Sequence, residues 1–173
     1  MKSKQAIKFS QRVLGLAVAS VFAALGVNSH AAVTATGTFA VNATVATSCT
    51  ISGTALAFGA AVDATSGVNT DSTSTLTATC TPGTTYTIGL SAGSASGATV
   101  TTRKMVNGTD TLNYGLYTTA LRDVNWDNTG AGLPGGTGTG AGQTYTVYGR
   151  IPSGQGAAKA LAYSDIITAT INF

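Results

Sequence analysis

The chain has 173 residues with nine Lys or Arg, six Asp, no Glu and one His, and this low charge excludes several functional classes. Four of the basic residues precede residue 32, so residues 32–173 hold five basic and six acidic side chains, a net charge of −1. This part has no basic stripe for binding nucleic acid, and its lack of His excludes Ser-His and Cys-His catalytic pairs.

The first 31 residues have the composition of a secretory signal peptide. A basic start is followed by an apolar run over residues 13–27 and by the small-x-small cleavage signal Ser29-His30-Ala31. The apolar run is shorter than the roughly 20 residues that a membrane span requires. We therefore predict that residues 1–31 are removed by cleavage after Ala31 and that the exported chain has no membrane anchor. The alternative is an uncleaved anchor.

Residues 33–45 alternate between two faces, as an extended strand does. One face carries Val33, Ala35, Gly37, Phe39 and Val41, and the other carries mostly Thr. A strand over this whole range would span about 43 Å, which is more than twice the length of a common strand. One small domain is not expected to use all of it. We predict that its first half is donated to a neighbouring copy.

Cys49 and Cys80 are the two cysteines, and both follow the predicted signal peptide. In an exported chain an even pair favours a disulfide, which would contribute about 3 to 4 kcal/mol by restricting the unfolded chain. Two free thiols or a metal-binding pair are the alternatives. A metal would need further His or Cys ligands, and residues 32–173 contain none.

The remaining sequence predicts an all-β fold. Candidate strands follow from alternation or short apolar runs at residues 55–58, 75–80, 85–90, 99–106, 112–116, 145–151 and 163–173. Asn107-Gly108 lies between two of them and predicts a hairpin. No helical periodicity occurs, so a β-sandwich is expected.

Two further segments complete this prediction. Residues 123–142 contain seven Gly and are expected to form an irregular surface loop from which no core is built. The last strand ends the sequence on an aromatic residue, which indicates that its last residues are clamped in place. One side of this strand carries four apolar residues, Ile167, Ala169, Ile171 and Phe173.

Motifs that could indicate a ligand site are weak. The pattern D-x-N-x-D from residue 123 begins like a calcium loop, but Asn128 and Pro134 stand where Gly and Glu are required. The glycines of residues 130–142 have neither the Lys nor the helix of a phosphate-binding loop. Trp126 could contact a sugar, although a lone Trp more often packs over a sheet edge. We predict no catalytic residue, cofactor or metal ion.

The second half of the chain carries an ordered set of motifs. They are Tyr114-Gly-Leu-Tyr117, Ala120-Leu-Arg122 with Trp126, Val147-Tyr-Gly-Arg-Ile-Pro152, and Tyr163-Ser-Asp165 with Thr170-Ile-Asn-Phe173. These motifs resemble the spore coat protein U domain, which includes the Csu-type pilin subunits of archaic chaperone-usher pili. The resemblance extends from before Cys49 to Phe173 and is loosest in residues 123–142.

The resemblance implies an immunoglobulin-like sandwich over residues 42–173 that lacks its last strand, preceded by a donor extension over residues 32–41. In such families a periplasmic chaperone supplies the missing strand. An outer-membrane usher then exchanges it for the extension of the next subunit, and a homo-polymer results. By this resemblance Cys49 and Cys80 form the disulfide of the family.

The resemblance also implies roles for individual residues. The donor strand would comprise Val33, Ala35, Gly37, Phe39 and Val41. The acceptor groove and chaperone-binding strand would comprise Ile167, Ala169, Ile171 and Phe173. We thus expect a non-enzymatic pilus subunit that is exported through the periplasm to the bacterial surface and serves adhesion and biofilm formation.

Two other functions are compatible with these residues. One is a component of a spore or cell-surface coat that uses the same assembly. The other is a secreted binding module or adhesin that folds its own N-terminal strand back and binds a ligand through Trp126 and the glycine-rich loop.

Overall fold

The computed structural model describes residues 31–173, and the chain divides into two units, Met1–Asn42 and Ala43–Phe173. The predicted signal peptide, apart from Ala31, lies outside the described residues. Residues 31–42 are exposed throughout, and neither they nor residues 43–48 form a strand. A β-strand is defined by hydrogen-bonded pairing. The expected strand over residues 33–45 is therefore absent from this structure. The residues of both its predicted faces are exposed.

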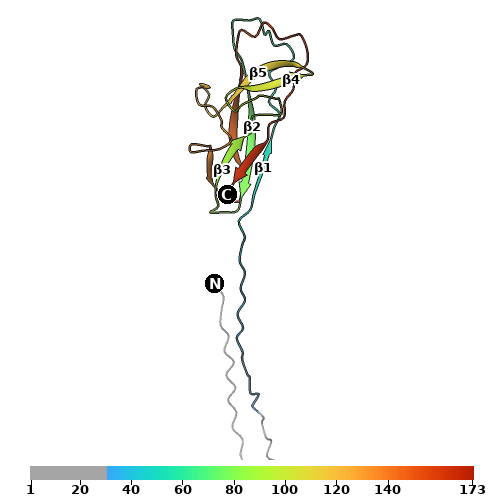
Figure 1. The fold of residues 1–173 in the computed structure, drawn as a ribbon. Coiled ribbons are helices and arrows are strands. Elements are labelled where there is room, and N and C mark those ends of the chain that lie inside the picture. Colours follow the sequence, from blue (N-terminus) through green and yellow to red (C-terminus); the bar gives the residue numbers. More distant parts are fainter. Residues whose placement is uncertain (1–30) are drawn as a thin grey trace, which may run out of the picture. The chain divides into compact units, whose positions relative to one another are not determined.

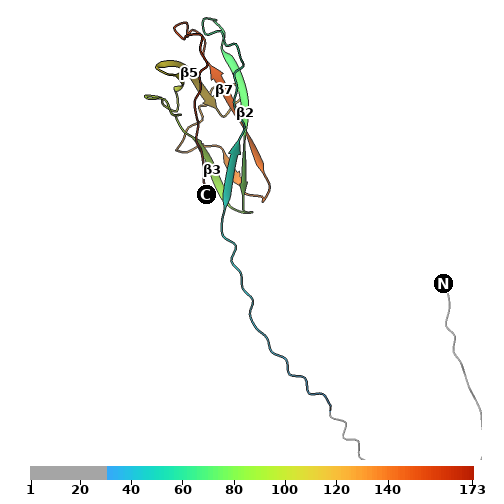
Figure 2. The same ribbon diagram turned by 90° about the vertical axis from the view of Figure 1, so that its right-hand side faces the viewer.

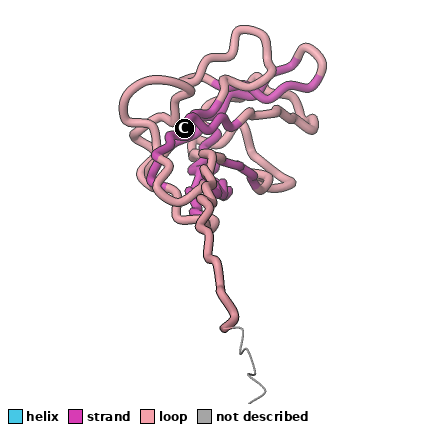
Figure 3. Tube along the Cα trace, turned by 90° about the horizontal axis from the view of Figure 1, so that it is seen from below, coloured by secondary structure: helices cyan, strands magenta, loops and turns pink. Residues whose placement is uncertain are grey.

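The second unit is an all-β fold of two antiparallel sheets (Figure 1). The larger sheet has the strand order β1-β2-β7-β5-β4, and the smaller has the order β6-β3-β8. Only strands and loops occur among residues 31–173, so no described helix could cross a membrane (Figure 3). The strands are β1 (Cys49–Gly53), β2 (Thr70–Cys80), β3 (Thr85–Leu90), β4 (Arg103–Asn107), β5 (Asp110–Tyr117), β6 (Gly135–Thr137), β7 (Gln143–Ile151) and β8 (Ala169–Asn172).

Alternation along β2 explains how the larger sheet is built. Leu76, Ala78 and Cys80 point into the core and are buried, while the Thr residues between them point outward. Figure 2 shows β2, β7 and β5 beside one another in this sheet. Because the side-chain period is two, a slip of one residue would expose the whole apolar set, and the register is fixed accordingly.

The core lies between the two sheets. Its largest fully buried side chains include Trp126, Tyr86, Ile88 and Leu90. The other buried apolar residues come mainly from the inward faces of β2, β5 and β7: Leu76, Ala78, Cys80, Leu112, Tyr114, Leu116, Val147 and Ile151. The sequence periodicity therefore predicted most of the core correctly.

The predicted hairpin at Asn107-Gly108 is confirmed by the pairing of β4 with β5. Gly108 has a φ of 58°, a backbone conformation in which Gly avoids the steric cost of a side chain. The predicted last strand over residues 163–173 is shorter in the structure, where β8 covers Ala169–Asn172 and Ser164 forms an isolated bridge with Val106. Residues 55–58 do not form a strand.

The expectation that residues 123–142 contribute nothing to the core was wrong. Trp126 is only 1% exposed, and β6 lies within this segment and pairs with β3. Gly135 and Gly138 allow the segment to lie close to β3 and to the end of β2, respectively. A Cβ on Gly135 would lie 2.1 Å from the carbonyl oxygen of Tyr86, and one on Gly138 would lie 2.4 Å from that of Thr81.

Candidate functional site

The domain has a large apolar groove with a volume of about 1280 Å³. Its floor is formed by inward-facing side chains of the larger sheet, namely Leu76, Leu112, Tyr114, Leu116, Val147 and Ile151. One wall is the chain from Ile51 to Val62, and the other is the chain from Ala158 to Ile167 together with Ala169. The groove thus opens where the first and last segments of the domain meet.

Both walls offer unpaired backbone. Among residues 31–173, β1 pairs only with β2 and β8 pairs only with β3, so each is an edge strand of its sheet. The two strands also contact each other. Beyond β1, the chain continues past Thr54 without joining either sheet, although the backbone N–H of Thr54 still donates to the carbonyl of Thr75. An additional strand could therefore add hydrogen bonds on either side.

Leu56 and Phe58 extend the apolar lining along the N-terminal wall. They pack over Gly149 of β7, where an added Cβ would come within 3.0 Å of both side chains. The Phe58 ring also meets the Tyr114 ring edge to face, with 6.3 Å between centroids. Aromatic pairs of this geometry contribute about 0.5 to 1.5 kcal/mol beyond the area they bury.

The predicted acceptor residues have two different environments. Ile167 and Ala169 line the groove, and both are partly buried against the core. Ile171 also packs against the core and lies opposite Ile88 of β3. Phe173 follows the end of β8 and is 59% exposed, and it does not line the groove. Their shared role in strand acceptance stays a prediction.

Asp165 holds the C-terminal wall in place. Its carboxylate accepts hydrogen bonds from the Tyr114 hydroxyl at 2.7 Å and from the backbone N–H groups of Ser94 and Ile166 at 2.8 Å each. The Ser94 hydroxyl also donates to it, at 2.8 Å. A side chain on Gly93, whose φ is 93°, would collide with this carboxylate.

These contacts shift the pKa values of both Asp165 and Tyr114. Burial raises the pKa of Asp165, but the hydrogen bonds from Ser94, Tyr114 and Ile166 outweigh burial and hold this pKa below its usual value. Burial also raises the pKa of Tyr114, and the hydrogen bond to Asp165 raises it further. The phenol therefore stays protonated as the donor, and the carboxylate stays ionised as the acceptor.

Arg103 braces the end of β3 beside the groove. Its side chain is fully buried, and its guanidinium donates to the carbonyls of Ser91, Val100, Leu90 and Trp126 at distances from 2.5 to 3.1 Å. Burial lowers the pKa of Arg103 from its ordinary value. Sequence reasoning missed this residue, because nothing in the local pattern marks an Arg whose partners are four backbone carbonyls.

The predicted donor residues are highly exposed. Val33 is 94% exposed, Phe39 is 87% exposed and Val41 is 82% exposed. Ala35 and Gly37 are exposed as well. Apolar side chains of this size are buried more often than exposed, so their exposure here is unusual. Their role as donor residues stays a prediction.

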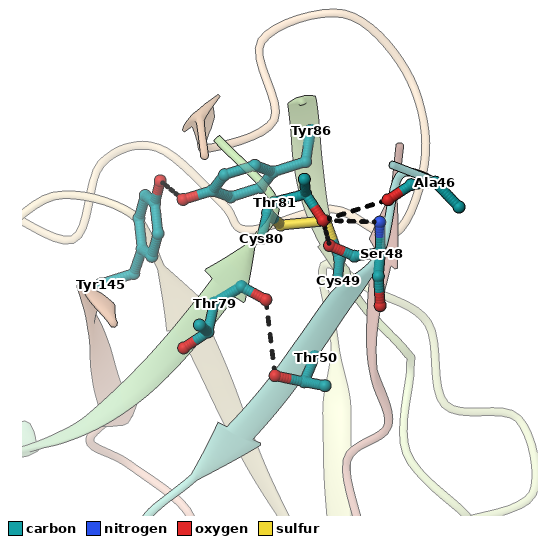
Figure 4. Close-up of a disulfide and its surroundings, with 9 residues drawn as sticks. All are labelled: Ala46, Ser48, Cys49, Thr50, Thr79, Cys80, Thr81, Tyr86 and Tyr145. Carbon is teal, nitrogen blue, oxygen red and sulfur yellow. Dashed lines mark hydrogen bonds between the residues drawn. A yellow bond between two sulfur atoms is a disulfide. The ribbon is translucent and has the colours of Figure 1, made fainter. Parts of the chain in front are cut away.

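The disulfide between Cys49 and Cys80 is confirmed, with a distance of 2.03 Å between the two sulfur atoms (Figure 4). Cys49 is the first residue of β1 and lies opposite Cys80, the last residue of β2. The neighbouring Thr81 hydroxyl donates to the carbonyl of Ser48 at 3.3 Å and accepts from the backbone N–H of Ser48 at 3.1 Å. The chain is therefore anchored both covalently and by hydrogen bonds where β1 begins.

The alternative ligand site around Trp126 is not supported. The indole is buried, and its N–H donates to the carbonyl of Ile88 at 2.9 Å, so it has no free face for a sugar. Asp123, the first residue of the calcium-like pattern, accepts a hydrogen bond from the Thr119 hydroxyl. Trp126 belongs to the core.

Comparisons with known proteins agree with this architecture. The model of the Spore Coat Protein U domain matches residues 35–170. Protein U of Myxococcus xanthus is 37% identical over an alignment of 175 positions, which covers 91% of this chain and 97% of that protein.

A solved structure shows the fold. It is the CsuC-CsuE chaperone-tip adhesion subunit pre-assembly complex from the archaic chaperone-usher Csu pili of Acinetobacter baumannii, with a TM-score of 0.53 and 19% identity. The match covers 75% of this chain and 40% of that chain. The fold is thus an immunoglobulin-like β-sandwich. The chain belongs to the Spore Coat Protein U domain family, whose members are structural and non-enzymatic proteins.

Proposed function

We propose that this protein is a chaperone-usher pilus subunit that polymerises by donor-strand exchange. Residues 33–41 of one copy would enter the groove of the next copy as an added strand. One observation carries this proposal: the same chain has an exposed apolar strip without a partner strand and an apolar groove bounded by two edge strands. The apolar strip lacks a sheet edge to pair with, and the groove offers two such edges.

The energy of this contact supports assembly. Burying Val33, Phe39 and Val41 would contribute roughly 5 to 9 kcal/mol before the costs of ordering. A whole domain is stable by only about 5 to 15 kcal/mol. A subunit with an empty groove is therefore expected to be marginally stable, and a filled groove is expected to stabilise it strongly.

The symmetry of the contact leads to a fibre. The donor and the groove are different surfaces, so each subunit offers a donor to one neighbour and a groove to another. A head-to-tail contact that does not close into a ring produces an open filament. The domain proper would comprise residues 42–173, and residues 32–41 would be the connecting element.

Donor-strand exchange of this kind requires accessory proteins. An exposed apolar groove invites non-specific association, so a periplasmic chaperone is expected to cover it until an outer-membrane usher exchanges the chaperone for the next donor. The structure from Acinetobacter, a chaperone bound to a pilus subunit, supports this part of the proposal by analogy. We place the product at the bacterial surface, in a fimbrium that serves adhesion and biofilm formation.

The direct test changes single residues of the donor. Phe39→Asp puts a charge on the apolar face, and the matched control Thr38→Asp puts the same charge on the opposite face. In size-exclusion chromatography we expect the Thr38→Asp control to polymerise and Phe39→Asp to remain monomeric. Equal polymerisation of both variants, or a solved assembly in which residues 33–41 fill their own subunit's groove, would overturn the proposal.

A spore or cell-surface coat is the second candidate, and the match to the Spore Coat Protein U domain favours it. The same strand exchange would operate, but the product would be a layer instead of a separate fibre. Electron microscopy of the surface of producing cells, with and without this chain, distinguishes the two.

A further inference from the structure

The outer surface of the larger sheet has an unusual composition. Eight hydroxyl side chains lie together on β1, β2 and β7, and we call this set the hydroxyl face. It comprises Thr50, Ser52, Thr73, Thr75, Thr77, Thr79, Thr144 and Thr146. The alternating residues between them, such as Leu76 and Ala78, are buried, so these eight point away from the core.

The register places these side chains in rows across the strands. Thr77 of β2 lies opposite both Ser52 and Thr144, and Thr75 lies opposite Thr146. Within the described residues, only the Thr50 side chain among the eight makes a hydrogen bond, to the carbonyl of Thr79 at 3.4 Å. The other hydroxyls are free to bond outside the domain.

No charged side chain belongs to the hydroxyl face, and the charges near it lie at one end. There Asp71 pairs with Arg150 at 2.7 Å and with Arg122 at 3.1 Å, and the Arg122 guanidinium lies over the ring of Tyr148, which is opposite Thr73. Soluble proteins usually have charges of both signs spread over their surfaces, because charges oppose association. The eight hydroxyl positions themselves carry no such charge.

From this arrangement we infer that the hydroxyl face is a lateral contact between fibres, with a second copy of the same face as its partner. A hydroxyl both donates and accepts hydrogen bonds, so two identical faces can bond to each other. Two identical charged faces would repel. The inference rests on the proposed polymerisation, and it explains how neighbouring fibres associate rather than how a fibre forms.

The size of the face indicates why a polymer is needed. Three strands about 4.8 Å apart and about 23 Å long give an area of about 300 Å². Stable complexes bury about 800 Å² on each partner, so one pair of faces is too small to hold two subunits together. Along two parallel fibres the contact repeats, and each additional pair then forms at a high effective concentration. Isolated subunits are thus expected to stay apart while fibres gather into bundles.

The test compares two double variants with equal added charge. Thr144→Lys with Thr146→Lys places two positive charges in the hydroxyl face, and Thr109→Lys with Thr129→Lys places them in exposed loops. Fibres of each are pelleted at low speed and imaged by negative-stain electron microscopy. We expect the first variant to form single fibres with bundling reduced at least about fivefold, and roughly 1 M salt to restore part of it by screening. The loop variant should bundle as the wild type does.

Several results would overturn the inference. They are equal bundling of the wild type and the first variant, equal loss in both double variants, and a wild type that forms single fibres without bundles. The last result leaves the proposed function standing, whereas a wild type that forms no fibres overturns both. Should the first variant fail to assemble, Thr73→Lys on β2 makes the same test at another exposed position of the face.

Discussion

The hydroxyl group of Tyr114 donates a hydrogen bond of 2.7 Å to the carboxylate of Asp165, and this contact joins the floor of the groove to its C-terminal wall. The wall precedes β8, the edge strand that the proposed donor would join. The position of that edge therefore depends on a polar contact as well as on apolar packing.

Asp165→Asn is expected to lower the free energy of unfolding at pH 7 by about 1 to 3 kcal/mol, because the amide replaces a charged acceptor of several hydrogen bonds. The folded-state pKa of Asp165 lies below the unfolded value of 3.8. Its stabilisation is therefore complete above that value and is lost as the pH falls through the folded-state pKa. Urea unfolding at pH 7 and pH 2.5 should show the difference between wild type and variant shrinking at the lower pH. A difference that does not change with pH would contradict this account.

Arg103→Met should be among the most destabilising single changes in the domain. It leaves four carbonyls without their donor, two of them in hydrogen bonds that are fully buried. Each unsatisfied buried group costs about 1 to 3 kcal/mol, so we expect a total loss above 3 kcal/mol. The control is Lys104→Met at the adjacent, partly exposed position, where a loss within about 0.5 kcal/mol is expected. Similar denaturant midpoints for the two variants would show that Arg103 is not a structural brace.

Replacing both Cys49 and Cys80 by Ala should lower the free energy of unfolding by about 3 to 4 kcal/mol, because the sequence separation of 31 residues makes the closed loop long. Thr81→Val tests the hydrogen bonds beside the disulfide and should cost about 1 kcal/mol. Thermal unfolding under oxidising and reducing conditions measures both effects. The Ala variant should be insensitive to reductant, and a wild type with the same insensitivity would contradict the proposed contribution.

Much of the fold follows from residue alternation. From Leu76 in β2 and from Val147 in β7, every second residue is nonpolar and buried, and the Asn107-Gly108 turn sets the pairing of β4 with β5. These features are local, since they depend only on the two-residue period and on turn chemistry. Cys49 and Cys80 were predictable for a different reason, because they are the only two cysteines in the chain.

The features that the sequence did not reveal are long-range. Trp126 lies in a segment rich in Gly, and its burial depends on accepting groups such as the Ile88 carbonyl, 38 residues away. Arg103 similarly depends on carbonyls from the end of β3, from the loop between β3 and β4, and from the loop that contains Trp126. The groove also could not be derived from periodicity, because it is defined by β1 and β8, which lie at opposite ends of the domain sequence.

Gly138→Ala tests whether the glycine-rich segment is packed or merely exposed. Gly138 is buried, and a Cβ there would lie 2.4 Å from the Thr81 carbonyl and 2.8 Å from the Cys80 Cβ, so either the segment or the end of β2 must move. Overpacking of this kind costs about 1 to 3 kcal/mol. Gly67→Ala is the matched control, because no atom lies within 4 Å of its added Cβ and its φ is not positive. Urea unfolding should show a lower midpoint for Gly138→Ala alone. Equal midpoints would mean that the segment moves aside at no cost and that its contact with the disulfide is dispensable.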